Sequence, residues 1–337
     1  MQLQQIETYP EELLSCDVKD LHHLFPQPTL IHLSGKNKQP LFVSVLLHGN
    51  ETTGFFALQN LLNKYAKQTL PRSLSVFFGN TQAAERGLRR LDGQLDYNRM
   101  WPGTEALACA ETQIAGQVVD IMREKEVFAS IDIHNNTGLN PHYACINRLD
   151  NRYLQLGNLF SRLVVYFIRP MGVQSAAFTE FCPAVTLECG RPGQQHGVDH
   201  AFEYLNDCLH LSELVDHPVH IQDIDLFHSS VQVKIQKNSS FSFTDKKSDL
   251  LFDKLLERMN FTEVPAGTCF GLVQDDSAMP LSAIDEHGLD VTDKFFKIDG
   301  AQLQIKRKTM PSMLTLDERV IRQDCLCYLM ERIALAV

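Results

Sequence analysis

The chain has 337 residues, and its 31 Lys and Arg residues against 41 Asp and Glu residues give a net charge of −10 with neutral histidines. This acidic balance disfavours contact with phosphate backbones and anionic membrane surfaces, so we expect neither nucleic acid nor a membrane as a partner. With 44% hydrophobic and 21% charged residues, the chain is not disordered, and its length predicts one large domain or two unequal ones.

Residues 1–215 alternate short apolar runs with longer amphipathic stretches, a pattern that is typical of an α/β architecture. Apolar residues recur near a period of 3.6 in the longer stretches, which predicts helices on both faces of a sheet. The predicted strands are 29–33, 41–47, 74–78, 127–133, 143–146, 164–168 and 184–187. The predicted helices are 53–67, 105–124, 151–162 and 195–214.

After residue 215 the pattern changes to short alternating segments separated by Gly, Pro and Asp, which predicts a smaller β-rich region. Its predicted strands are 219–225, 229–235, 241–244, 269–273 and 302–306, and its predicted helices are 248–258 and 317–334. We therefore expect two domains, residues 1–215 and residues 216–337, with the second packed beside the functional site of the first.

The nine cysteines are odd in number and form no C-x-x-C pair. They are expected to be reduced, buried thiols rather than disulfides or zinc ligands. Residues 1–20 include five acidic residues and no apolar run of signal-peptide length, and the chain has no uncharged apolar window of about 18 residues. These features predict a soluble, cytoplasmic protein.

A histidine and a glutamate follow the predicted strand 41–47, in the sequence His48-Gly-Asn-Glu51. Sites in open α/β sheets form at the carboxyl ends of strands, and Gly49 allows the sharp turn that brings both side chains to one point. An H-x-x-E pair is weak evidence by itself. Glu51 could equally be an acidic residue that complements the start of a helix.

A second polar pair, Asp132 and His134, leaves the predicted strand 127–133. Taken alone, His134 would more readily be a histidine hydrogen-bonded within its own loop. Together with His48 and Glu51, however, it completes a set of two histidines and one carboxylate. That set leaves a fourth tetrahedral position open, as in a catalytic rather than a structural zinc site, and predicts one Zn²⁺ per chain.

Four segments follow one another along the chain: His48-Gly-Asn-Glu51-Thr-Thr-Gly54, Leu95-Asp96-Tyr97-Asn98-Arg99, Asp132-Ile-His134-Asn-Asn-Thr-Gly138 and Thr186-Leu-Glu188-Cys-Gly190. Together they resemble the aspartoacylase/succinylglutamate desuccinylase family, a branch of the zinc carboxypeptidase-like hydrolases. The resemblance covers residues 28–214, and the β-rich remainder corresponds to the family's second domain by position. It implies a zinc-carboxypeptidase-like mixed sheet flanked by helices, with a smaller C-terminal β-rich domain.

The resemblance implies that His48, Glu51 and His134 hold zinc and that Glu188 acts as general base and then as proton donor. Zinc lowers the pKa of water from about 16 toward about 7, and a nearby carboxylate can pass the proton to a leaving amine. Glu188 follows the predicted strand 184–187, so it too would project from the carboxyl edge of the sheet. The alternative is a solvated carboxylate at a strand end.

Asn98 and Arg99 match the family's pair that holds the substrate carboxylate, a role that suits a planar guanidinium with a fork of donors. Arg86, Arg89 and Arg90 stand nearby in an acidic chain, which favours an anion site over scattered surface charge. Arg89, in its Arg-x-Leu-Asp context, resembles the family arginine that stabilises the oxyanion. Arg90 could serve instead.

The ten residues before Glu188 contain no arginine, whereas aspartoacylases carry one there for the second carboxylate of aspartate. This departure argues against N-acetylaspartate as the substrate. Glu180 could select for a substrate amine or be an exposed loop residue. His196 and His200 have the i, i+4 spacing of a metal pair, but we favour a solvated helix face because no third ligand stands beside them.

The sequence thus predicts a zinc-dependent hydrolase that cleaves the linear amide bond of an N-acyl amino acid. Its partner would be a small, carboxylate-bearing N-acyl amino acid or a short peptide. One alternative is a metallocarboxypeptidase that acts on a small peptide or cell-wall fragment, since the same residues would serve it. Another is a non-catalytic module that binds metal or a metabolite. The acyl group, the amino acid and the oligomeric state do not follow from the sequence.

Overall fold

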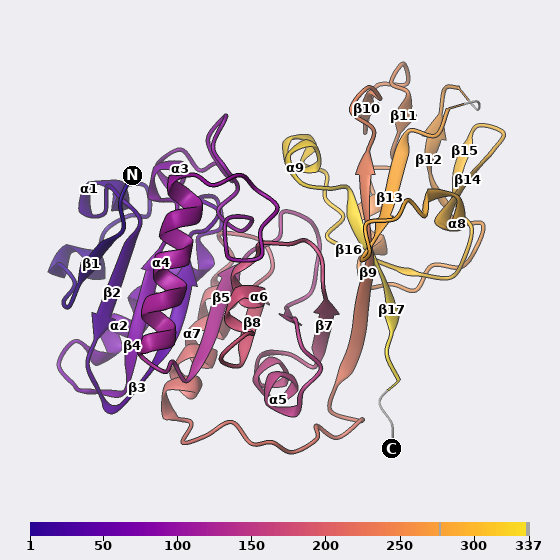
Figure 1. The fold of residues 1–337 in the computed structure, drawn as a ribbon. Helices are drawn as coiled ribbons and strands as arrows, with labels where there is room; N and C mark the ends of the chain where they lie inside the picture. Colours follow the sequence, from indigo (N-terminus) through magenta and orange to yellow (C-terminus); the bar gives the residue numbers. More distant parts are fainter. Residues whose placement is uncertain (276–277, 335–337) are drawn as a thin grey trace.

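A large mixed β-sheet organises the computed structural model, which describes residues 1–275 and 278–334 (Figure 1). Within these residues the sheet has twelve strands. In spatial order they are β1 (Gln4–Ile6), β2 (Thr29–Leu33), β4 (Leu70–Phe78), β3 (Gly35–Val45), β5 (Ala129–His134), β8 (Ala184–Glu188), β6 (Tyr143–Ile146), β7 (Leu163–Phe167), β9 (Asp225–Ile235), β17 (Cys327–Arg332) and β16 (Met310–Ser312), with β13 (Leu281–Asp285) also paired to β9. The predicted mixed α/β fold is confirmed.

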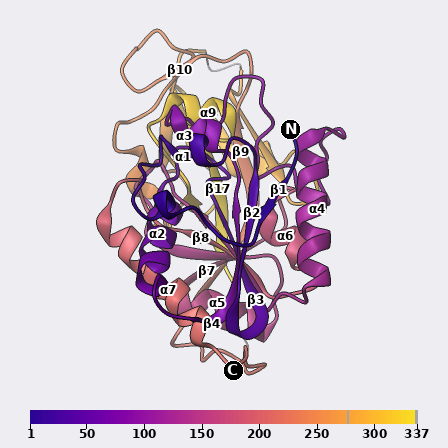
Figure 2. The same cartoon turned by 90° about the vertical axis from the view of Figure 1, so that its left-hand side faces the viewer.

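Helices cover both faces of this sheet. Figure 2 shows α2 (Thr53–Tyr65) and α7 (Gln195–His210) on one side, and α4 (Ala110–Glu124) and α6 (Gln174–Phe178) on the other. Apolar side chains from both faces of the central strands are therefore buried. The other helical segments of the described residues are η1 (Glu11–Leu14), α1 (Leu21–Leu24), α3 (Thr81–Glu85), α5 (Asn151–Phe160), η2 (Leu256–Met259), α8 (Thr292–Phe295) and α9 (Glu318–Gln323). Among the described residues, no helix has both the length and the hydrophobicity that a bilayer crossing requires.

The C-terminal part of the chain contributes to two sheets. β9 extends the large sheet through parallel pairing with β7, and β17 pairs with β9 in the antiparallel sense. Beside it, the described residues form a five-stranded sheet (Figure 1) in the order β10 (Phe241–Ser242), β11 (Leu250–Leu251), β12 (Cys269–Val273), β15 (Gln302–Ile305) and β14 (Phe296–Asp299). The division at residue 215 stays a prediction, and the large sheet continues across it.

Three elements predicted in the C-terminal part are wrong. The helix expected over 317–334 ends with α9, and the residues after it form β17. Here the pairing partner offered by β9 outweighs the helical spacing of the apolar residues, as tertiary context often does. The helix expected over 248–258 is replaced by β11 and η2. The strand expected over 219–225 is absent, because β9 begins only at Asp225.

A tight seam joins the loop after β5 to the C-terminal part. The Asn260 side chain donates to the carbonyl oxygens of Leu314 at 2.8 Å and Leu139 at 3.1 Å, and accepts from the Leu314 N–H at 2.8 Å. Gly138 lies in this seam, where a Cβ atom would stand 1.8 Å from the Leu314 carbonyl oxygen. The backbones of the two parts of the chain are therefore in direct contact here.

We expect Gly138→Ala to lower the free energy of unfolding by about 1–3 kcal/mol, because the added methyl group has to displace the Leu314 backbone. Gly116→Ala is the matched control, since the space beside Gly116 in α4 is open. That variant should gain about 0.5–1 kcal/mol from better helix propensity. Urea unfolding measures both changes, and wild-type stability in Gly138→Ala would contradict the tight seam.

Candidate metal centre and active site

The three predicted metal ligands converge at the carboxyl ends of two neighbouring strands. β3 leads into His48 and Glu51, β5 ends on His134, and these two strands pair in parallel. All three side chains are buried, and one donor atom from each lies within 4.8 Å of the other two. In residues 1–275 and 278–334, no other set of three His, Cys, Asp or Glu side chains converges in this way.

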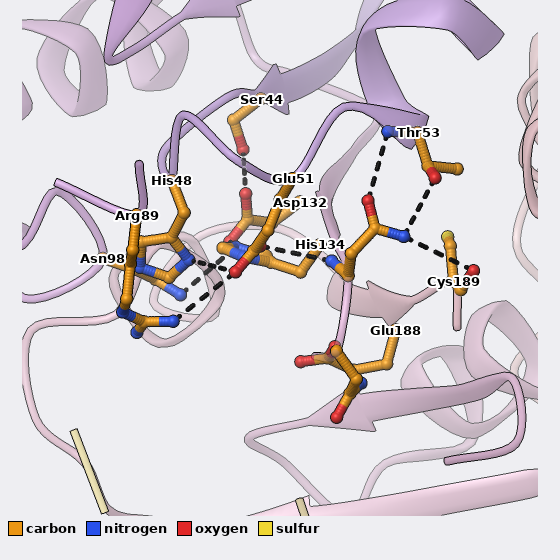
Figure 3. Close-up of polar contacts among 12 residues, drawn as sticks. Ser44, His48, Glu51, Thr53, Arg89, Asn98, Asp132, His134, Glu188 and Cys189 are labelled. Carbon is orange, nitrogen blue, oxygen red and sulfur yellow. Dashed lines mark hydrogen bonds and ion pairs between the residues drawn. The ribbon is translucent and has the colours of Figure 1, made fainter. Parts of the chain in front are cut away.

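Each imidazole presents one nitrogen to Glu51 and the other to a second carboxylate. His48 Nδ1 lies 2.8 Å from Glu51 Oε1, and His134 Nδ1 lies 2.7 Å from Glu51 Oε2 (Figure 3). The Nε2 atoms of His48 and His134 lie 3.0 Å from Asp96 Oδ1 and 2.7 Å from Asp132 Oδ2, respectively. Carboxylates behind metal-binding histidines fix the ring orientation and tautomer.

These supporting roles of Asp96 and Asp132 were not evident from the sequence. A local signal exists for Asp132, which precedes His134 by two residues and so shares its strand face. Its other carboxylate oxygen accepts a hydrogen bond from Ser44 Oγ at 2.6 Å. Asp132 is thus held in place from β3 while it orients a ring on β5.

The charges around the three side chains suit a divalent cation. Burial acts to raise the pKa of Glu51, but His48 and His134 outweigh it and hold this pKa below its usual range. Burial likewise acts to lower the pKa of His134, but Asp132 and Glu51 outweigh it, so this pKa lies above its usual value. A buried carboxylate between two imidazoles, each backed by another carboxylate, favours added positive charge. Two nitrogens and one carboxylate match the donor set of catalytic zinc.

Glu188 lies next to this cluster. It ends β8, which pairs with β5, and stands opposite His134 in the sheet register. Its Oε2 accepts a hydrogen bond from Asn136 Nδ2 at 2.5 Å, and burial raises the pKa of Glu188 to about 8. Figure 3 shows its side chain near the ligands. A carboxyl group whose pKa lies near neutrality can both accept and donate a proton.

Arg89, rather than Arg90, lies beside the metal ligands. Arg89 Nη1 donates to Glu51 Oε1 at 3.4 Å, and Arg89 Nη2 donates to Asp96 Oδ2 at 3.1 Å. Arg90 Nη1 instead donates to the carbonyl oxygen of Gln94 at 2.6 Å. Of the two arginines, Arg89 therefore has the position that an oxyanion-stabilising residue needs, and that role stays a prediction.

Asn98 and Arg99 line the same cavity as Arg89. Asn98 Nδ2 lies 3.2 Å from His134 Nε2, and Asn98 Oδ1 accepts from the backbone N–H of Gln174 at 3.0 Å. Arg99 Nη1 donates to the carbonyl oxygen of Asn98 at 2.7 Å. The pair is thus fixed at the border of the cluster, within reach of a molecule in the cavity.

Several residues of the C-terminal part, among them Asp324 and Tyr328, also line this cavity. Asp324 Oδ2 accepts from Arg89 Nη2 at 3.2 Å, and Asp324 Oδ1 accepts from Arg99 Nη2 at 3.1 Å. Sequence reasoning missed both residues. Asp324 lies 225 residues beyond Arg99, and no spacing pattern connects them. The contact arises only when the C-terminal part packs beside the sheet.

The ligand cluster opens into a cavity of about 120 Å³. Because one water molecule needs about 10–15 Å³ on this measure, the cavity has room for a small organic molecule. The metal ligands and arginines contribute charged groups to its lining. Tyr143, Val165, Phe167, Val173 and Met313 contribute apolar surface to the same lining.

Two further hypotheses from the sequence concern residues away from this cavity. Glu180 is exposed and does not line the cavity, which fits the exposed loop residue rather than a contact to a substrate amine. His196 and His200 do have a third histidine beside them, because the ring of His142 lies 5.2 Å from each. These rings stack on one another, and their donor atoms do not form a convergent set.

Residues 38–194 match the family model described as the succinylglutamate desuccinylase/aspartoacylase catalytic domain. This segment is thus similar to the catalytic domain of that family. It contains every site residue predicted from the sequence, so the resemblance inferred from the four ordered segments is confirmed. The succinylglutamate desuccinylase/aspartoacylase family comprises hydrolytic deacylases, which indicates an enzyme that acts on amide bonds.

Solved structures of this family share the fold. Succinylglutamate desuccinylase from Chromobacterium violaceum matches with a TM-score of 0.57 and 18% identity, over 90% of this chain and 87% of that chain. The Vibrio parahaemolyticus desuccinylase matches with a TM-score of 0.61 and 13% identity, over 97% of each chain. Murine aminoacylase 3 matches with a TM-score of 0.54 and 13% identity, over 89% of this chain and 97% of that chain. No curated protein sequence matches the chain.

We expect Asp132→Asn to weaken zinc binding by about 10- to 100-fold, because the amide no longer fixes the ring and charge of His134. Asp120→Asn, an equivalent change at an exposed position of α4, should bind zinc like the wild type. Zinc titration against a competing chelator gives both dissociation constants. Equal affinities in the two variants would show that Asp132 does not support the metal ligands.

Proposed function

We propose that this protein is a zinc-dependent hydrolase that cleaves the amide bond of an N-acyl amino acid and releases a carboxylic acid and an amino acid. One zinc ion per chain would be held by His48, Glu51 and His134. The observation that carries this proposal is the convergence of these side chains next to Glu188, within a domain of the succinylglutamate desuccinylase/aspartoacylase family. A cytoplasmic location stays a prediction.

Glu188 is the residue best placed to move the proton. When bound in the cluster, zinc would supply Lewis-acid chemistry that polarises a carbonyl group and makes water more acidic. Glu188 would accept a proton from the attacking water through Oε1, since Asn136 holds Oε2. The same carboxyl group would then give that proton to the leaving nitrogen. The hydroxyl group ends on the acyl carbon and the proton on the amine, so the atoms balance.

The arginines and Asn98 would orient the substrate. Arg89 offers donors beside Glu51, where negative charge on the carbonyl oxygen would develop. Asn98 and Arg99 would hold the carboxylate of the amino acid, a group that a guanidinium binds well. Holding this carboxylate would place the amide bond next to Glu188. Part of the binding energy would then orient the reacting groups and so raise the rate.

A second cavity, of about 440 Å³, lies beside the first. Arg99, Asp324 and Tyr328 are among the residues that line both cavities. This neighbouring space favours a second candidate function, carboxypeptidase-like cleavage of a short peptide, because a longer substrate would have room to extend once these side chains move apart. A non-catalytic metal-binding module would need no proton carrier, so Glu188 argues against it. Rates on N-acyl amino acids and on short peptides, measured with one zinc-loaded preparation, separate the two activities.

Glu188→Gln should keep its zinc but lose about 10²- to 10⁴-fold in kcat, because the amide has the shape of the carboxyl group but cannot carry the proton. Metal analysis and steady-state rates give the two quantities. Glu180→Gln, at an exposed position, is the matched control and should turn over normally. Near-normal turnover in Glu188→Gln would remove Glu188 from the mechanism.

Arg99→Ala should raise KM for carboxylate-bearing N-acyl amino acids by about 10- to 100-fold, since a charge-assisted hydrogen bond contributes about 1.5–3 kcal/mol. The KM for the carboxamide analogues of the same substrates should change little. Arg90→Ala serves as the control because Arg90 contacts the Gln94 carbonyl group instead. An equal rise in KM for the acids and their carboxamide analogues would count against a carboxylate contact at Arg99.

A further inference from the structure

One carboxylate of the C-terminal part bridges the two guanidiniums that face the substrate position. Asp324 Oδ2 lies 3.2 Å from Arg89 Nη2, and Asp324 Oδ1 lies 3.1 Å from Arg99 Nη2. The side chains of Asp324 and Arg89 are 17% and 11% exposed. A bridge that is shielded to this degree is screened less by water and salt than a surface ion pair.

The chain holds Asp324 firmly in this position. The residue directly follows α9 and precedes β17, and its near neighbour Leu326 donates its backbone N–H to the Val233 carbonyl oxygen at 2.8 Å. The backbone N–H of Asp324 itself donates to the Val320 carbonyl oxygen of α9 at 2.9 Å. Arg319 Nη2 on α9 also donates to Asp92 Oδ1 at 3.1 Å, but Asp92 is 95% exposed and this pair contributes little. Asp324 is therefore a fixed part of the cavity wall.

Every arginine that lines the cavity has a carboxylate partner within the chain. The shielded pairs are Arg89 with Glu51, Asp96 and Asp324, and Arg99 with Asp324, whereas Arg169 pairs with Glu105, which is 69% exposed. No lysine is among the described residues of the cavity lining. One substrate carboxylate can share the remaining donors of Arg99. A second carboxylate beside Arg89 or Arg99 would meet guanidiniums that are already paired, and the negative charge of Asp324 would repel it.

The rest of the cavity offers a different kind of contact. Val165, Phe167, Val173 and Met313 contribute apolar surface to the lining of the same cavity. A carboxylate placed there would lose its hydration without gaining a partner, which is costly. An apolar group would gain about 25 cal/mol for each Å² of surface removed from water.

We infer that Asp324 is a specificity-determining residue that restricts the site to N-acyl amino acids with one carboxylate and an apolar side chain. The inference rests on the proposed function and names its substrate class. Asp324 takes up donors of two arginines, so that positive charge remains for one substrate anion and a second anion is disfavoured. The apolar residues of the lining then accept the side chain of the amino acid.

The test compares N-acetyl-L-leucine, which has an apolar side chain, with N-acetyl-L-glutamate, whose side chain carries a second carboxylate. Zinc-loaded wild type should favour the leucine compound by about tenfold or more in kcat/KM. Asp324→Asn should reduce this preference by about tenfold, chiefly through a lower KM for the glutamate compound. Asp324→Glu retains the charge and should retain the preference. Asp92→Asn removes the carboxylate that pairs with Arg319 on α9 and leaves the partners of Arg89 and Arg99 unchanged. This variant should also retain the preference for the leucine compound.

Calorimetric titration of the same proteins, each also carrying Glu188→Gln so that the compounds are not hydrolysed, adds a readout that needs no turnover. The ratio of the two Kd values is internal to each preparation, so partial unfolding of Asp324→Asn does not change it. If the wild type hydrolyses neither compound, the proposed function fails, while the Kd ratio still tests Asp324. Wild-type preference for glutamate, an unchanged ratio in Asp324→Asn, or binding of neither compound would overturn the inference.

Discussion

The parallel pairing of β3 with β5 is the constraint on which the site depends. It brings the carboxyl ends of two strands that are distant in sequence to one edge of the sheet, and so places His48 and Glu51 beside His134. β8 pairs with the other side of β5, and the same register sets Glu188 opposite His134. Functional groups that are carried by buried strands keep their geometry before a ligand arrives, which limits the entropy lost on binding.

This geometry concentrates negative charge, and the chain balances it through Arg89. Its guanidinium contacts Glu51 in the ligand cluster, Asp96 behind His48, and Asp324 from the C-terminal part. One side chain thus links the metal ligands to the wall that faces the substrate. The charge of a bound substrate and the charge of the ligand cluster are therefore coupled, because both act on the same guanidinium.

The strands and ligands of the first part could be predicted because their signals are local. Apolar runs that are buried on both faces lead directly to His48 and His134, and the family segments follow in order. The C-terminal part carries no such signal. Its last apolar segment becomes β17 rather than a helix because β9 is there to pair with it. Asp324 escaped prediction for the same reason, since its role depends on arginines that only the folded chain brings near.

Anomalous diffraction at the zinc absorption edge, from crystals of zinc-loaded protein, tests the central claim most directly. We expect one peak per chain, about 2.0–2.2 Å from the Nδ1 atoms of His48 and His134 and from the Glu51 carboxylate. The absence of a peak at this place, or a sole peak at another group such as His196 and His200, would contradict the account.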